Sequence, residues 1–243
     1  MSELKAAIKL WKKLGLAPEF TPVKRFGTPS TYGKIFLTKG NKLMKVMAWS
    51  KNAEREMQIA KIAGNANIGP KVYNTRTWNP TFVAAKSINA SILSNLAPAR
   101  LTNRIVVITM DKVPRAKSLY NAINNGTVKN FSKVENIVRR MHAAGIHHGN
   151  LHGDNILVYV NNSGNLKFVP INFGASKHNT RITNTSSAVR YAIKNPGSSG
   201  TVTRVNTMHE PEYYRSNRSQ PVKSNENMIK HLKEYFNLKT KKP

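Results

Sequence analysis

The sequence contains no cysteine and few acidic residues. Without cysteine there are no disulfides and no thiolate metal sites, and a reducing, intracellular compartment is permitted. Only 11 residues are acidic, and just two of them are aspartates, Asp111 and Asp154. Any chemistry that needs an aspartate is therefore confined to these two positions.

Long hydrophobic runs are also missing. The longest, residues 105–110 and 155–160, have the length of strands, whereas a membrane-spanning helix needs about 20 apolar residues. The first residues lack an apolar stretch followed by a small-residue cleavage site. We therefore expect neither a transmembrane segment nor a secretory signal. The 243 residues, 40% of them hydrophobic, suffice for one core or two small lobes.

Positive charge is what the sequence has in excess. Lysine and arginine total 39, which gives a net charge of +28 with histidine neutral. These residues are spread along the whole chain and are not gathered in one tail. A field of this sign favours a polyanionic partner, which could be nucleic acid, an anionic membrane or an acidic protein surface. Solubility is the alternative explanation, but it rarely requires so large an imbalance.

Apolar periodicity predicts a basic amphipathic helix over residues 1–16. Its apolar residues recur at helical spacing, Gly15 provides a stop, and most of its lysines lie elsewhere on the wheel. The apolar stripe is expected to pack on its own domain. A membrane or a partner protein is the alternative.

The remaining patterns predict an α+β protein in two lobes. Strands are expected at residues 34–38, 42–48, 104–109, 156–159 and 166–169, and helices at 52–63 and 131–144. Residues 179–220 are polar and basic and predict an extended segment. A last helix is expected around residues 228–236, with Ser224 as its N-cap.

Two motifs in the second half of the chain carry a resemblance. Residues 141–158 include His-Gly-Asn-Leu-His-Gly-Asp-Asn-Ile-Leu after a helix ending in Met-His, and residues 169–174 read Val-Pro-Ile-Asn-Phe-Gly. Upstream, Lys45 lies in a strand pattern and Glu56 in a helix pattern. In this order, over about residues 25–175, the motifs resemble the protein kinase superfamily, closest to its small atypical and viral members.

The resemblance implies a two-lobed fold with a small β-rich N-lobe and a reduced helical C-lobe. The N-lobe and hinge would occupy residues 17–113 and the core of the C-lobe 114–178. The basic segment 179–220 and a terminal helix with a basic tail, 221–243, would follow.

The resemblance also implies ATP and Mg²⁺ as cofactors and a set of site residues. Lys45 would hold the α and β phosphates, oriented by Glu56. Gly33 would belong to the loop over the phosphates and Asp111 to the interlobe hinge. Asn155 would be a metal ligand.

The sequence departs from the superfamily where the chemistry takes place. The catalytic aspartate falls at Asn150, and the metal-binding aspartate falls at Asn172. An amide is a weak ligand for Mg²⁺ and cannot act as a general base. Asp154 is the only aspartate placed to substitute. The phosphate-covering loop also has Thr28 and Ser30 where glycines are expected.

Three hypotheses follow. The first is a catalytically impaired kinase fold serving as a basic structural or binding component, which the resemblance places in the virion or beside the genome of a large DNA virus. The second is an atypical serine/threonine kinase that uses Lys45, Asn155 and Asp154. The third is a dedicated nucleic-acid-binding protein in which binding of ATP plays no part. A zinc site at His147, His148 and His152 with Asp154 is a weaker interpretation, because the kinase-like register accounts for His148 and His152.

Overall fold

The computed structural model describes residues 2–30, 33–79, 104–129 and 131–178, together with four helical positions, 230, 233, 234 and 237. The chain divides into two compact units, Met1–Lys61 with Pro70–Lys112, and Ile62–Gly69 with Val113–Pro243. The predicted extended segment 179–220 and the Ser224 cap lie outside the described residues. Within those residues, no helix combines the length and hydrophobicity needed to cross a membrane.

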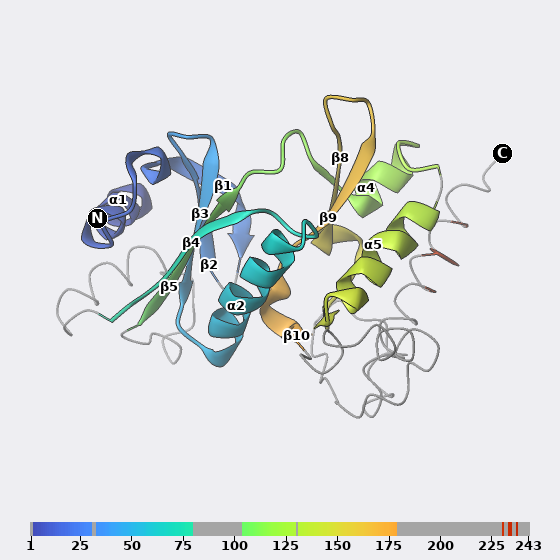
Figure 1. Cartoon of the computed structure of the whole chain (residues 1–243). Helices are drawn as coiled ribbons and strands as arrows, with labels where there is room; N and C mark the ends of the chain where they lie inside the picture. The colour runs from blue at the N-terminus through green and yellow to red at the C-terminus, as the bar shows by residue number, and fades with distance from the viewer. Residues whose placement is uncertain are drawn as a thin grey trace. The chain divides into compact units, whose positions relative to one another are not determined.

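The first unit is built on a five-stranded antiparallel sheet with the strand order β1-β2-β3-β5-β4 (Figure 1). Its helices are α1 (Glu3–Lys13) and α2 (Lys51–Asn65), whose last turn is assigned to the second unit. The strands are β1 (Pro22–Ser30), β2 (Gly33–Thr38), β3 (Lys42–Ala48), β4 (Val72–Trp78) and β5 (Ile105–Asp111). A short 3-10 turn, Pro18–Phe20, joins α1 to β1.

Strand β3 is covered on both faces, which explains its nearly continuous apolar sequence. Met44 and Val46 belong to the core cluster that includes the buried side of α1. Met47 packs instead with Val106 of β5 and with Ala53 of α2. Because successive side chains of a strand point to opposite faces, Lys45 shares the face of Met47 and is directed toward α2.

The amphipathic stripe of α1 packs on the back of this sheet. Ala6, Ala7 and Leu10 are fully buried there. Ser2 caps the helix by accepting from the backbone N–H of Lys5 at 3.4 Å, and Gly15 has a φ of +58°, so the helix is shorter than the predicted 1–16. Leu4, Trp11 and Leu14 are partly buried against the same cluster, so most of the apolar stripe packs on its own domain.

The acidic residue of α1 fastens the helix to the strands. Glu3 accepts from Nη1 of Arg25 at 2.8 Å and pairs with Nζ of Lys34, whose side chain is buried. Lys34 is two residues from Phe36 along β2, so both side chains lie on the face of the sheet that packs against α1. One carboxylate thus pairs with both a buried lysine and a half-buried arginine.

The second unit combines short strands with two described helices. A three-stranded sheet has the order β6-β8-β9, and β7 pairs with β10. The elements are β6 (Lys117–Ser118), α4 (Leu119–Asn124), α5 (Ser132–Ala143), β7 (Ile146–His147), β8 (Ile156–Val160), β9 (Leu166–Pro170) and β10 (Lys177–His178). The apolar face of α5, Val134, Ile137, Val138 and Met141, is buried in its core.

Two further contacts of α5 lie within the second unit. Arg140 donates to the carbonyl oxygens of Ala66 and Asn67, at 3.4 and 2.9 Å, just beyond the end of α2. Glu135 forms an ion pair of 3.6 Å with Lys233, one of the described positions in the terminal helix. The overall composition is α+β, as predicted.

Candidate functional site

Lys45 and Glu56 form a buried ion pair in the first unit. The two side chains are only 8% and 11% exposed, and the lysine ammonium donates to Oε1 of Glu56. Strand alternation directs Lys45 toward α2, and α2 presents Glu56 about one and a half turns after its start. The pair matches the phosphate-anchoring pair that the resemblance implies. Removing either partner would leave a buried charge uncompensated.

Gly33 has a structural role at the start of β2. It pairs with Met47 in the sheet. A Cβ at this position would lie 2.5 Å from the carbonyl oxygen of Val46 and 2.6 Å from Cγ of Met47. Close packing of the strands thus accounts for this glycine without a nucleotide. The side chains of residues 28–30 lie outside the described part.

Asp111 ends β5 and is held by two neighbours. Nζ of Lys42 lies 2.6 Å from Oδ1 of Asp111, and the hydroxyl of Tyr73 donates to the same oxygen at 2.8 Å. The hydrogen bonds that Lys42 makes to Asp111 and, second, to Tyr73 raise the pKa of Lys42. The predicted hinge aspartate is thus engaged in a cross-strand contact between β3, β4 and β5.

In the second unit, His148 anchors the loop that precedes β8. Its ring is fully buried, and burial lowers the pKa of His148 to about 4. Nε2 lies 2.8 Å from the carbonyl oxygen of Ile171, and because a carbonyl can only accept, Nε2 carries the ring proton. Ser176 donates to the backbone oxygen of His148 at 2.8 Å, and the ring of Phe173 lies 5.2 Å away. The histidine thus joins the two motifs of the resemblance.

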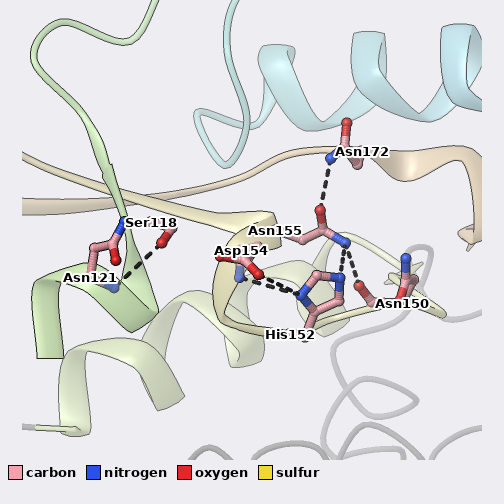
Figure 2. A network of polar contacts seen from close by, with 7 residues as sticks. All are labelled: Ser118, Asn121, Asn150, His152, Asp154, Asn155 and Asn172. Atoms are coloured by element: carbon pink, nitrogen blue, oxygen red, sulfur yellow. Dashed lines mark hydrogen bonds and ion pairs between the residues drawn. The ribbon is translucent and has the colours of Figure 1, made fainter. Parts of the chain in front are cut away.

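Asn155 is the centre of an amide network (Figure 2). Its Nδ2 donates to the backbone oxygen of Asn150 at 2.8 Å and lies 2.9 Å from Nε2 of His152. The contact with a carbonyl oxygen requires the nitrogen on that side, so the amide orientation is fixed. Its Oδ1 therefore faces Asn172, whose Nδ2 donates to it at 2.7 Å.

Asn172 reaches this network from an unusual backbone conformation. Its φ of +64° and ψ of 57° lie in the left-handed region. Asparagine and aspartate adopt that region more readily than most residues with a side chain. The turn that follows, Phe173–Ala175, places Phe173 in the core, so the backbone geometry at Asn172 is part of the local fold.

Neither Asn150 nor Asp154 is placed to act as the general base for proton transfer. Oδ1 of Asn150 is buried and has no hydrogen-bond partner among the described residues. The Asp154 side chain is 65% exposed, and its Oδ2 lies 4.0 Å from Nδ1 of His152. Figure 2 shows Asp154 and Asn150 on opposite sides of the His152 ring. The only aspartate of this unit is thus turned away from the Asn150 side.

The network does not fit a Mg²⁺ ion. Mg²⁺ takes oxygen ligands, usually including one or two carboxylates. Here the side-chain oxygen of Asn155 already accepts an N–H, and Asn172 directs a donor toward it. Among the residues that the structure describes, no group of three or more histidines and acids could hold a metal ion.

Comparison with known proteins supports the kinase-like assignment. Residues 103–188, about a third of the chain, match the lipopolysaccharide kinase (Kdo/WaaP) family. The matched segment contains β5, α5, the loop around Asn155, and Asn172. No curated protein matches the chain. Together with the five-stranded sheet of the first unit, the match shows a kinase-like α+β fold.

The structure brings the predicted residues together in two groups. Asn150, Asn155 and Asn172 meet in the second unit, with Asp154 beside them, and Lys45 and Glu56 meet in the first. The contacts that support them were not predicted. Ser176 and the carbonyl of Ile171 hold His148, and neither position carries a local sequence signal. Their closeness to Asn172 in the chain was the one clue.

Proposed function

We propose that this protein is a kinase-fold protein that does not carry out Mg²⁺-dependent phosphoryl transfer and acts as a basic binding component for nucleic acid. The hydrogen bond from Asn172 to Asn155 carries the first part. It joins the two positions that the resemblance assigns to metal ligation. At Asn172 an N–H group points to the place where a metal would need an oxygen ligand. The loop is thereby held by an amide contact without a cation.

Proton transfer lacks its base for a separate reason. An amide at Asn150 cannot accept the proton of an incoming hydroxyl, and the carboxylate of Asp154 is largely in solvent. Phosphoryl transfer depends on aligned substrates and neutralised phosphates, so the loss of both groups removes most of the catalytic apparatus. The buried Lys45–Glu56 pair remains, and it supports metal-independent nucleotide binding as a residual property.

The binding role rests on charge. A net charge of +28 on 243 residues attracts polyanions over long range and supplies the contacts that neutralise phosphates. Among polyanions we favour nucleic acid, since the apolar stripe of α1 is buried and contributes nothing to membrane insertion. Packing beside a viral genome in a virion is the setting that the resemblance suggests.

Two assays on the purified chain test this proposal. ATP turnover with Mg²⁺ should not exceed that of the Lys45→Met variant, whereas Mg²⁺-dependent turnover that disappears in both Lys45→Met and Asp154→Asn would overturn it. Duplex DNA should bind with an affinity that falls steeply as salt rises. A flat salt response would remove the charge-based role.

A second candidate is supported by the family match. If the chain does transfer phosphate, its match to a lipopolysaccharide kinase family favours a sugar hydroxyl of lipopolysaccharide over serine or threonine as the acceptor. The intact Lys45–Glu56 pair is the observation that favours this activity. Incubation with labelled ATP and lipopolysaccharide, followed by detection of label in the lipid, would test it.

A further inference from the structure

The outer side of α1 carries four lysines. Lys5, Lys9, Lys12 and Lys13 are exposed, whereas Ala6, Ala7 and Leu10 are buried. With 3.6 residues per turn, the four lysines fall within about 100° of the helix circumference. At 1.5 Å per residue, Lys5 and Lys13 are separated by about 12 Å along the axis. We call these four residues the α1 lysine stripe.

The stripe is not neutralised by its own helix. Glu3 is the only acidic residue of α1, and it is directed inward to Arg25 and Lys34. Within the described part of the chain, none of the four lysines forms an ion pair or a side-chain hydrogen bond. Because the only carboxylate of α1 pairs with Arg25 and Lys34, the outer face of the helix carries positive charge alone.

The packing of α1 fixes the helix that carries this stripe and leaves the stripe only its charge for binding. The apolar side of the helix is locked into the core with Phe36 and Met44. Trp11 is part-buried, and its indole N–H donates to the carbonyl oxygen of Ala17 at 3.1 Å. A membrane-bound amphipathic helix needs its apolar face free to enter the lipid. Here that face is occupied, so a membrane would gain only charge attraction.

We propose that the α1 lysine stripe is a docking surface for the phosphate backbone of double-stranded nucleic acid. This inference rests on the proposed function and assigns the surface that performs it. Lysines on one side of a fixed helix can contact successive phosphates, and each such contact releases a counterion. Contacts to backbone phosphates fix the position of a protein on the duplex but carry no sequence information. Binding at this surface is therefore independent of sequence.

A matched pair of quadruple variants tests the assignment. The first replaces Lys5, Lys9, Lys12 and Lys13 by Gln, which retains helix propensity. The second replaces four exposed lysines elsewhere, Lys51, Lys61, Lys133 and Lys167, by Gln. Each set lowers the net charge by four, from +28 to +24. Binding of full-length protein to a short duplex DNA of mixed sequence is measured from about 50 to about 200 mM salt.

The stripe variant should bind at least about tenfold more weakly, and its salt slope should fall by about 0.9 for each phosphate that it no longer neutralises. The dispersed variant should change much less. If both variants weaken binding equally, the surface assignment is wrong while the binding role stands. If the wild-type protein does not bind DNA, the binding role itself fails.

Two further arms protect the test. Thermal melting of both variants checks that the fold is retained, and a single reversal, Lys9→Glu against Lys61→Glu, repeats the comparison if four changes unfold the chain. Vesicles containing phosphatidylserine replace DNA in a parallel measurement. Stripe-dependent binding to vesicles without stripe-dependent binding to DNA would overturn the proposal in favour of an anionic membrane.

Discussion

Nδ2 of Asn172 donates to Oδ1 of Asn155 at 2.7 Å, which joins the motif after β9 to the loop before β8. The hydrogen bond links two side chains that would both face a cation if Asn172 were an aspartate. The resemblance assigns both positions to metal ligation, and here the two side chains are bonded directly to each other.

Restoring the carboxylate should create a cation site. In Asn172→Asp, the donor becomes an acceptor beside the Asn155 oxygen, so the variant loses about 1 kcal/mol of stability without metal. Mg²⁺ or Mn²⁺ at a hundredfold excess over Kd should return about 2.7 kcal/mol. Thermal melting with and without the cation measures both effects. Asn172→Gly, which accepts the same backbone but adds no ligand, should show no cation-dependent rise; the idea is wrong if it behaves like the aspartate variant.

The Lys45–Glu56 pair should be costly to break from one side. In Glu56→Gln the buried ammonium loses its carboxylate, and we expect a loss of about 3 kcal/mol. The double variant Lys45→Met with Glu56→Leu should recover most of this loss. Urea denaturation measures all three proteins. Glu54→Gln, on the same helix, is the control for charge removal, and an equal effect of the two single changes would contradict the buried pair.

Gly33 should tolerate no side chain, because of the sheet and not because of a nucleotide. A methyl group there would lie 2.5 Å from the Val46 carbonyl oxygen, which cannot move without distorting β3. We expect Gly33→Ala to cost about 1–3 kcal/mol in the absence of any ligand. The measurement is the urea midpoint of the free protein. An unchanged midpoint would show that the strands separate easily at this point.

Acid should weaken the fold through His148. Burial lowers the pKa of His148 from 6.5 to about 4, so the unfolded chain binds more protons than the folded one between these values. The stabilisation is complete above pH 6.5 and decreases as the pH falls toward 4. At pH 5 the loss is about 2 kcal/mol for this residue.

Unfolding free energies measured from pH 7 to pH 5 check this prediction. His148→Gln should be less stable at pH 7, because the bond to Ile171 is disturbed, but its stability should depend less on pH. The half-buried His142, whose pKa burial also lowers to about 4, contributes a similar slope and remains in the variant. Parallel curves for the two proteins would show that His148 takes no part.

Elements with their own strong patterns were predictable from the sequence. Apolar periodicity located α1, α2 and α5, and the hairpins β2–β3 and β8–β9, to within a few residues. Strand β1 was not predicted, since it contains Gly27 and two prolines and lacks clear alternation. Helix α4 has only six residues, and β6, β7 and β10 have two residues each, so tertiary pairing defines them.

The site was predictable as a set of positions and not as a set of contacts. The motif order identified Lys45, Glu56, Asn150, Asn155 and Asn172, because residue type and spacing carry that information. The direction of each amide depends on which neighbour is a carbonyl and which is a ring nitrogen. For the same reason, no local pattern indicated that Asn155 would accept from Asn172 or that Glu3 would be directed inward.

The left-handed backbone at Asn172 has an evolutionary consequence. Among residues with a side chain, asparagine and aspartate are the two best suited to this conformation, and they have nearly the same size. Their codons differ by a single nucleotide. A change between aspartate and asparagine at this position therefore needs one mutational step and leaves the turn intact, and the reverse step is equally short. Few other residues with a side chain could replace Asn172 and keep this backbone conformation.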